Sequence, residues 1–249
     1  MSGHSKWATI KHKKGAADKA RGKLWAKLIR QVEVAARGGG GDPEANPTLR
    51  TMVDKAKAAS VPNDTIDRAI KRATGELEGV TYESVTYEGY APEGVAVFVD
   101  VLTDNRNRTA ADVRHIFSKQ GGSMAEPGAV AWQFDRKGVL AVSKAVSEED
   151  LMLIALDAGA DDILDEGENW RVTCSPSDLT AVRAALEQAD IALTSADVTM
   201  LPKTVVSLNT AEAARKVLRL IDALDEHDDV QDVYANFDVP DEILETVEA

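Results

Sequence analysis

The chain has 249 residues, of which 29 are basic and 42 acidic, so its net charge is −13. Hydrophobic residues make up 44%, enough for sizeable cores, and at about 100–200 residues per domain the length predicts two or three domains. The longest apolar run, residues 151–156, is far shorter than the roughly 20 residues that span a bilayer, which argues against a membrane protein.

The cell compartment follows from cysteine use and from the N-terminus. Cys174 is the only cysteine, so the chain cannot form an internal disulfide. No apolar region follows the basic start, so a secretory signal is not evident. We therefore expect a reduced, cytoplasmic protein.

Charge is divided unequally along the chain. Residues 1–30 hold nine basic side chains and one acid, residues 1–79 have a balance of +7, and residues 80–249 have a balance of −20. Exposed lysine and arginine pair naturally with a phosphate backbone, which predicts nucleic-acid binding by the first part. The acidic remainder would face protein, such as components of the transcription or translation machinery. The alternative is a basic tail kept for solubility.

The first fifteen residues show no apolar periodicity. Trp7 stands among lysines, where an aromatic ring can stack on a base while its neighbours hold phosphates. Packing of Trp7 on the following helices is an equally good interpretation. The candidate contacts in this segment are Lys6, Trp7, Lys11, His12, Lys13 and Lys14.

Residues 16–37 have helical periodicity. Apolar residues from Trp25 to Ala36 recur at steps of three and four, and basic residues form a second stripe. The segment offers few local acids as ion-pair partners, which favours phosphate binding over a merely solvated face. The candidate contacts here are Lys19, Arg21, Lys23, Lys27 and Arg30.

Two further helices complete an all-α domain over residues 1–79. Asn46 followed by Pro47 predicts the start of the second helix, and Asn63 is expected to cap the third. Arg68, Lys71 and Arg72 are expected to point away from the apolar stripe of the third helix, as further phosphate contacts. That basic face lacks side chains that distinguish bases, so binding should depend strongly on salt and weakly on base sequence.

After Gly79 the periodicity changes from 3.6 to 2. Residues 82–90 and 95–102 predict strands, of which the second is nearly all apolar and therefore central. A polar loop over residues 103–108 precedes a helix, which Thr109 or Asn107 is expected to cap. Residues 130–134 predict another strand.

The polar loop contains candidate contacts of its own. Asn105, Arg106 and Arg108 carry the side chains best suited to bidentate contacts with bases and phosphates. The alternative, with equal weight, is a loop held by hydrogen bonds to Asp104 and Asp112.

The next segment has the order strand, helix, strand, strand, helix, strand. The elements fall at residues 139–142, 147–158, 162–164, 170–174, 176–188 and 195–200, which is the ferredoxin-like order. Residues 204–208, 210–224 and 230–237 then add a strand, a helix and a strand. We predict an α+β fold in which the three-helix domain precedes an α/β domain (residues 80–134 plus 203–249) with a ferredoxin-like βαββαβ domain (residues 135–202) inserted in it.

Several motifs together resemble the YebC family. They stand at residues 3–7 (GHSKW), 10–13 (IKHK), 66–72 (IDRAIKR), 87–90 (YEGY), 102–109 (LTDNRNRT), 126–128 (EPG), 135–138 (DRKG), 229–231 (DVQ) and 236–238 (NFD). The resemblance covers the whole chain. It implies a helical domain followed by two α/β domains, one inserted in the other, and a cytoplasmic DNA-binding transcriptional regulator. Some family members act instead as translation factors on ribosomes.

No constellation of catalytic residues is evident. The four histidines are scattered, and neither a phosphate-binding loop nor a nucleophile motif is present. Cys174 should be a small buried residue. The acids at residues 161–162 and 165–166 could attract Mg²⁺, but surface acids explain them better. We expect no catalytic residue, no metal and no cofactor.

The sequence therefore predicts a DNA-binding transcriptional regulatory protein that contacts the phosphate backbone through its basic N-terminal domain. The alternative is a ribosome-associated translation factor that binds rRNA or tRNA. Both use the same basic residues.

Overall fold

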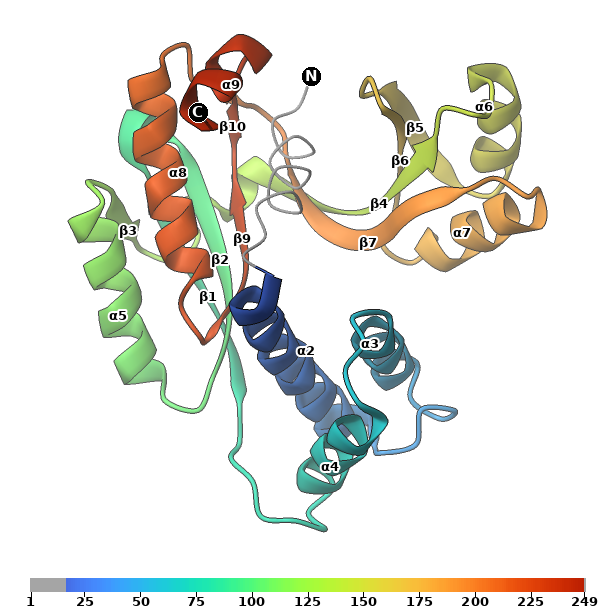
Figure 1. Cartoon of the computed structure of the whole chain (residues 1–249), viewed down its shortest axis with the longest axis vertical. Helices are drawn as coiled ribbons and strands as arrows, with labels where there is room; N and C mark the ends of the chain where they lie inside the picture. The colour runs from blue at the N-terminus through green and yellow to red at the C-terminus, as the bar shows by residue number, and fades with distance from the viewer. Residues whose placement is uncertain (1–16, 249) are drawn as a thin grey trace.

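The structure is a computed structural model, and it describes residues 17–248 (Figure 1). Three helices come first, and two four-stranded antiparallel sheets with their own helices follow. Figure 1 shows the helices at the bottom and the two sheets above them, side by side. The predicted α+β class is confirmed.

The three helices α2 (Ala17–Gly39), α3 (Pro47–Ala58) and α4 (Asn63–Ala73) enclose a small aliphatic core. Asn46 fixes the turn between the first two. Its side chain accepts a hydrogen bond from Leu49 N at 3.0 Å, which caps α3, and donates to the carbonyls of Ala35 and Gly40, both at 2.9 Å. The same amide therefore starts one helix and holds it against the end of another.

The prediction that Asn63 caps the third helix is wrong. Pro62 occupies the cap position, no side chain accepts a hydrogen bond there, and Asn63 is the first residue of α4. The extended backbone of Pro62 (φ −61°, ψ 137°) is sufficient to turn the chain into the helix.

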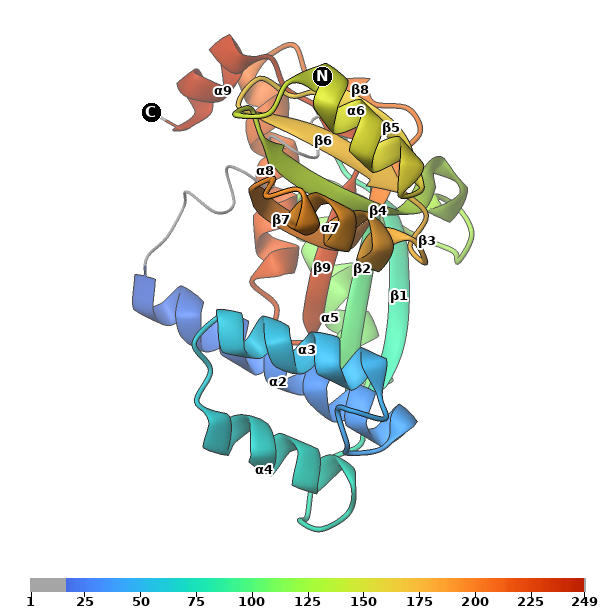
Figure 2. The same ribbon diagram turned by 90° about the vertical axis from the view of Figure 1, so that its right-hand side faces the viewer.

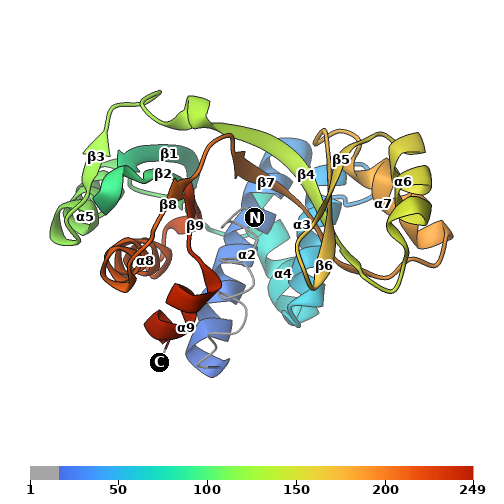
Figure 3. The ribbon, with the colours of Figure 1, turned by 90° about the horizontal axis from the view of Figure 1, so that it is seen from above.

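The first sheet has the order β3-β1-β2-β9. Its strands are β1 (Glu83–Tyr90), β2 (Ala96–Thr103), β3 (Ser123–Ala125) and β9 (Val230–Ala235). Helices α5 (Arg106–Lys119) and α8 (Ala211–Asp225) cover one face, as Figure 3 shows from above, and α9 (Asp241–Glu248) packs near α8. The nearly all-apolar β2 lies between two strands, which confirms its predicted central place.

The second sheet has the order β5-β6-β4-β7, with all neighbours antiparallel. Two helices lie among its strands along the chain. In chain order the elements are β4 (Phe134–Ser143), α6 (Glu148–Asp157), β5 (Ala160–Asp165), β6 (Asn169–Cys174), α7 (Leu179–Gln188) and β7 (Leu193–Pro202). This is the ferredoxin-like arrangement. The chain then forms β8 (Val206–Ser207) and α8, returns to the first sheet with β9 and ends in β10 (Phe237–Asp238) and α9. The ferredoxin-like block is therefore inserted between strands of the first sheet, as predicted. The exact division into domains at residues 79, 134 and 202 stays a prediction.

Strands β4 and β7 connect the two sheets (Figure 2). They pair along their whole length, from Phe134 opposite Pro202 to Val142 opposite Leu193. At the start of β4, Phe134 packs against Phe98 of β2, with ring centroids 6.3 Å apart. The ferredoxin-like block is therefore anchored on the open face of the first sheet.

Two predicted element starts are wrong. Residues 131–133 form a 3₁₀ turn, η2 (Ala131–Gln133), so the strand expected over 130–134 begins only at Phe134. Helix α5 is capped by Asn105, which accepts a hydrogen bond from Arg108 N at 3.1 Å, rather than by Thr109 or Asn107. The second half of the expected polar loop, residues 106–108, is therefore the first turn of α5.

Within residues 17–248, none of the helices combines the length and the apolar character that crossing a bilayer requires.

We expect Asn46→Ala to lower the free energy of unfolding by about 1–2 kcal/mol, because it removes the cap of α3 and the hydrogen bonds to Ala35 of α2 and to Gly40 just after α2. Urea denaturation followed by circular dichroism measures this. Asn63→Ala is the matched control and should change stability by less than about 0.5 kcal/mol. Equal effects of the two changes would contradict the assignment of the caps.

Candidate nucleic-acid interface

Part of the predicted interface precedes the described residues. Lys6, Trp7, Lys11, His12, Lys13 and Lys14 lie outside the described residues. Lys19 is described only as a member of α2. Their role stays a prediction.

The basic stripe of α2 lies against an acidic turn, residues 225–229, that follows α8 (Figure 1). Lys23 Nζ donates to the carbonyl of Glu226 at 2.9 Å, and Lys27 Nζ lies 3.1 Å from Asp225 Oδ1. Arg30 contacts the carbonyl of Asp228 and lies 3.4 Å from Asp229. These three cations are therefore engaged by the protein itself, through residues about 200 positions away in sequence.

Asp229 is the centre of this contact. Its buried carboxylate accepts hydrogen bonds from Thr109 Oγ1 at 2.7 Å, Arg108 Nη2 at 2.8 Å and Thr103 Oγ1 at 3.2 Å. Burial raises the pKa of Asp229, but the hydrogen bonds from Arg108 and Thr109 and the charges of Arg108 and Arg30 together lower it below its ordinary value. Asp229 is therefore ionised, and its carboxylate binds side chains of α2, α5 and β2.

The polar segment 105–108 is also used internally. Arg108 bonds to Asp104 at 2.9 Å as well as to Asp229, and Asn105 is occupied as the cap of α5. Asp112, the other expected partner, instead lies 3.3 Å from His227. The side chain of Arg106 is exposed. The hydrogen-bonded interpretation accordingly accounts for Asn105 and Arg108, and phosphate contact by the segment stays a prediction.

The basic residues of α4 divide into two groups. Arg72 forms an ion pair with the buried carboxylate of Glu33 in α2, through Nε at 2.8 Å and through Nη2. Arg68 and Lys71 are exposed, and the Nε of Arg68 donates to the carbonyl of Asp64 at 3.0 Å. Of the three basic residues of α4, Arg68 and Lys71 thus extend toward solvent, beside the exposed acids Asp64 and Asp67.

Three of the four acids weighed as a Mg²⁺ site have basic partners. Asp161 pairs with Lys137 at 2.8 Å, Asp165 with Lys144 at 2.6 Å and Glu166 with Arg171 at 2.6 Å. In the described range 17–248, no three His, Cys, Asp or Glu side chains gather in a way that could hold a metal ion. Cys174 is fully buried, as predicted, and burial raises the pKa of its thiol.

A further buried carboxylate was missed by the sequence interpretation. Glu88, in the middle of β1, accepts hydrogen bonds from the backbone N–H groups of Gly128, Val130 and Ala131 at 2.6–2.8 Å. Burial raises the pKa of Glu88, but these three hydrogen bonds outweigh it and lower the pKa below the ordinary value. The sequence offered one signal for this site: Glu88 is an acid within residues 87–90 (YEGY), a run that otherwise has the character of a strand.

The loop that Glu88 holds presents an exposed tryptophan. Trp132 is 66% exposed, and its indole N–H donates to the carbonyl of Ala129 at 3.0 Å, which fixes the ring. The side chain belongs to the acidic part of the chain, residues 80–249.

Comparisons with known proteins cover nearly the whole chain. The profile "TACO1/YebC protein N-terminal domain" matches residues 5–76, and "TACO1/YebC second and third domain" matches residues 82–237. A "Probable transcriptional regulatory protein" of Rubrobacter xylanophilus is 59% identical over 99% of both chains. One of Syntrophobacter fumaroxidans is 55% identical over 99% of this chain and 100% of its own.

A solved structure is similar as well. The crystal structure of a conserved hypothetical protein from Aquifex aeolicus is 48% identical, with a TM-score of 0.80, and the match covers 91% of this chain and 94% of that chain. The fold described above is therefore shared with an experimental structure.

We expect Asp229→Asn to lower the free energy of unfolding by about 2–4 kcal/mol, because it leaves charged partners of a buried carboxylate without their anion. The measurement is a urea titration. Asp228→Asn, a change at an exposed neighbour whose carbonyl contact is retained, is the control and should have little effect. A loss confined to Asp228→Asn would refute the role assigned to Asp229.

The lowered pKa of Glu88 predicts a specific pH dependence. Because the folded-state pKa lies below the ordinary value of 4.5, its stabilisation is fully present above pH 4.5 and is lost as the pH falls through the folded-state value. Glu88→Gln should therefore be less stable than the parent at pH 7, and the difference should shrink below pH 4.5. Urea midpoints measured from pH 7 to pH 3 test this, and a constant difference would contradict it.

Proposed function

The chain belongs to the TACO1/YebC family. We propose that it is a regulatory protein that binds nucleic acid through phosphate contacts, and that this nucleic acid is DNA, in the regulation of transcription. The observation that carries the proposal is the division of charge, +7 over residues 1–79 against −20 over the remainder. The relatives named probable transcriptional regulatory proteins support the regulatory role.

Two sets of cations have different tasks in this proposal. The lysines before residue 17, together with the exposed Arg68 and Lys71 of α4, contact phosphates directly. Lys23, Lys27 and Arg30 hold α2 on the acidic turn and so position the interface. Arg72 does the same for α4 through Glu33.

The binding mode is electrostatic. Arg68 and Lys71 are proposed to contact phosphates, and phosphate contacts position the protein without selecting sequence. If six to ten phosphates are neutralised, affinity should fall by about 10³ to 10⁵ between 50 and 200 mM salt.

The protein acts in the cytoplasm and by binding rather than by catalysis. Its acidic sheets are directed to protein partners, because their charge repels the same polyanion that the helical part attracts.

We expect the double change Arg68→Glu and Lys71→Glu to weaken binding of a labelled DNA duplex by at least about tenfold at low salt. The slope of log affinity against log salt should fall by about 2 in magnitude, one for each lost phosphate contact. Fluorescence anisotropy over a salt series measures both. The matched control is Arg114→Glu with Lys119→Glu on α5, which are also exposed helical cations but lie on the acidic part. Equal losses from both pairs would refute the proposed interface.

Ribosome sedimentation separates DNA from the ribosomal alternative. The variant Lys11→Glu, Lys13→Glu, Lys14→Glu should lose the DNA mobility shift and leave sedimentation with ribosomes unchanged if the protein acts on DNA. Loss of co-sedimentation in the same variant would instead support the translation factor. Lys23 and Lys27 are kept, because reversing their charge would also break the contact with the acidic turn.

A further inference from the structure

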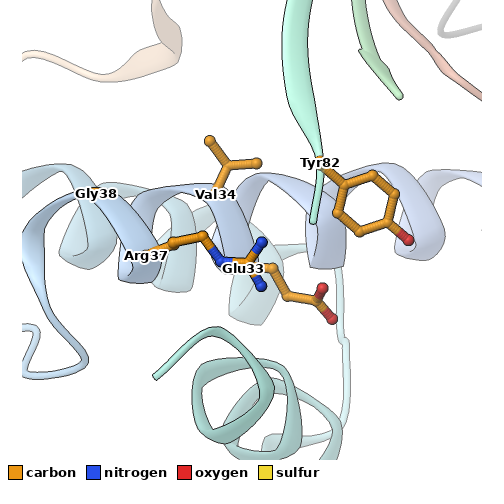
Figure 4. Close-up of a pocket in the computed structure, with 5 residues that line it drawn as sticks. All are labelled: Glu33, Val34, Arg37, Gly38 and Tyr82. Atoms are coloured by element: carbon orange, nitrogen blue, oxygen red, sulfur yellow. The ribbon is translucent and has the colours of Figure 1, made fainter. Parts of the chain in front are cut away.

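A small cavity lies where the end of α2 meets the segment that enters β1 (Figure 4). It is lined by Glu33, Val34, Arg37, Gly38 and Tyr82, and its volume is about 190 Å³. Sites for drug-sized ligands measure roughly 300 Å³ or more. This cavity therefore has room for a single planar ring system rather than for an extended ligand.

Glu33 gives the cavity an unused hydrogen-bond acceptor. The residue is 5% exposed, and both hydrogen bonds from Arg72 go to the same carboxylate oxygen, Oε1. Among residues 17–248, no donor reaches the second oxygen, Oε2. This oxygen keeps contact with solvent, so an N–H group of a ligand can donate to it.

Tyr82 supplies an aromatic wall. The Arg30 guanidinium lies over its ring, 5.5 Å from the centroid, which helps to fix the ring. On the helix side, Arg37 Nη2 donates to the carbonyl of Val80 at 3.2 Å, and the rest of this exposed guanidinium is free to meet an anion. One cavity thus combines a stacking surface, an acceptor and a cation.

We propose that this cavity binds one unpaired nucleobase that carries an exocyclic amino group. The base stacks on Tyr82, its amino group donates to Glu33 Oε2, and Arg37 contacts the adjoining phosphate. Uracil presents carbonyl oxygens on both sides of its N–H group, and these face the carboxylate unfavourably. The inference rests on the proposed nucleic-acid binding and adds the class of base that is recognised.

The base must come from a single strand, because stacking and pairing hide these groups in a duplex. Single-stranded RNA and locally melted DNA offer the same chemistry. The experiment therefore has an RNA arm and a DNA arm.

The test uses the full chain and labelled short oligonucleotides of cytidine, uridine, deoxycytidine and deoxyuridine, with affinities measured by fluorescence anisotropy at neutral pH. Cytosine and uracil differ little in size and stacking surface, so the comparison isolates the amino group. We expect cytosine strands to bind at least about 10-fold more tightly than uracil strands, the fold-change of one hydrogen bond to a charged group. A preference for cytosine in both arms supports a site that recognises the base alone. A preference for cytosine that is confined to the RNA arm supports RNA as the source of the base.

Two variants assign the effect to the cavity. Tyr82→Leu should weaken all single strands by about 5-fold or more, whereas Tyr82→Phe should keep the stacking and the affinity. Glu33→Gln should abolish the cytosine preference while circular dichroism confirms that the chain is folded. Trp132→Leu, which removes an exposed aromatic residue elsewhere, is the control and should leave the preference intact.

Two results would overturn the inference in different ways. Equal affinity for cytosine and uracil strands, or a preference that Tyr82→Leu and Glu33→Gln leave unchanged, refutes the base site and leaves phosphate binding standing. Failure to bind any single strand or duplex at low salt refutes the proposed function together with the base site.

Discussion

The ionised carboxylate of Asp229 is the contact on which the arrangement of the first sheet and the helical part depends. It is buried, so it must be paired, and its partners come from segments far apart in sequence: Arg30 of α2, Arg108 and Thr109 of α5, and Thr103 of β2. The apolar core of the helices and that of the first sheet share no residue. Apolar burial therefore stabilises each part, whereas this polar network fixes how α2 lies on the sheet.

The same network sets a condition for function. Lys23, Lys27 and Arg30 are attracted by the acidic turn, and a phosphate backbone would attract them for the same electrostatic reason. Because these contacts combine carboxylates with backbone carbonyls, a bound polyanion would compete for cations that already have partners. On α4, Arg68 donates to a carbonyl, that of Asp64, rather than to a carboxylate, so a phosphate would face weaker competition there.

Glu88 follows a similar physical rule in the first sheet. A carboxylate buried in a strand is tolerated because three backbone N–H groups of the loop after β3 satisfy it. The loop is held there just before β4 leaves for the second sheet. One buried charge thus positions the helical part and another positions the entry to the ferredoxin-like block.

The sequence by itself determined most elements and their order, because helical and strand periodicity, the cap at Asn46 and the central place of β2 are set within a few residues. It also predicted the ferredoxin-like block from the order of its elements. It predicted neither the short strand β3 nor the C-terminal helix α9. Only the tertiary structure decided the partners of the charges: Arg30 pairs with Asp229, and the Thr109 hydroxyl donates to the same carboxylate. The physical reason is that backbone preferences act locally, whereas an ion pair depends on which distant segments the fold brings within a few ångströms.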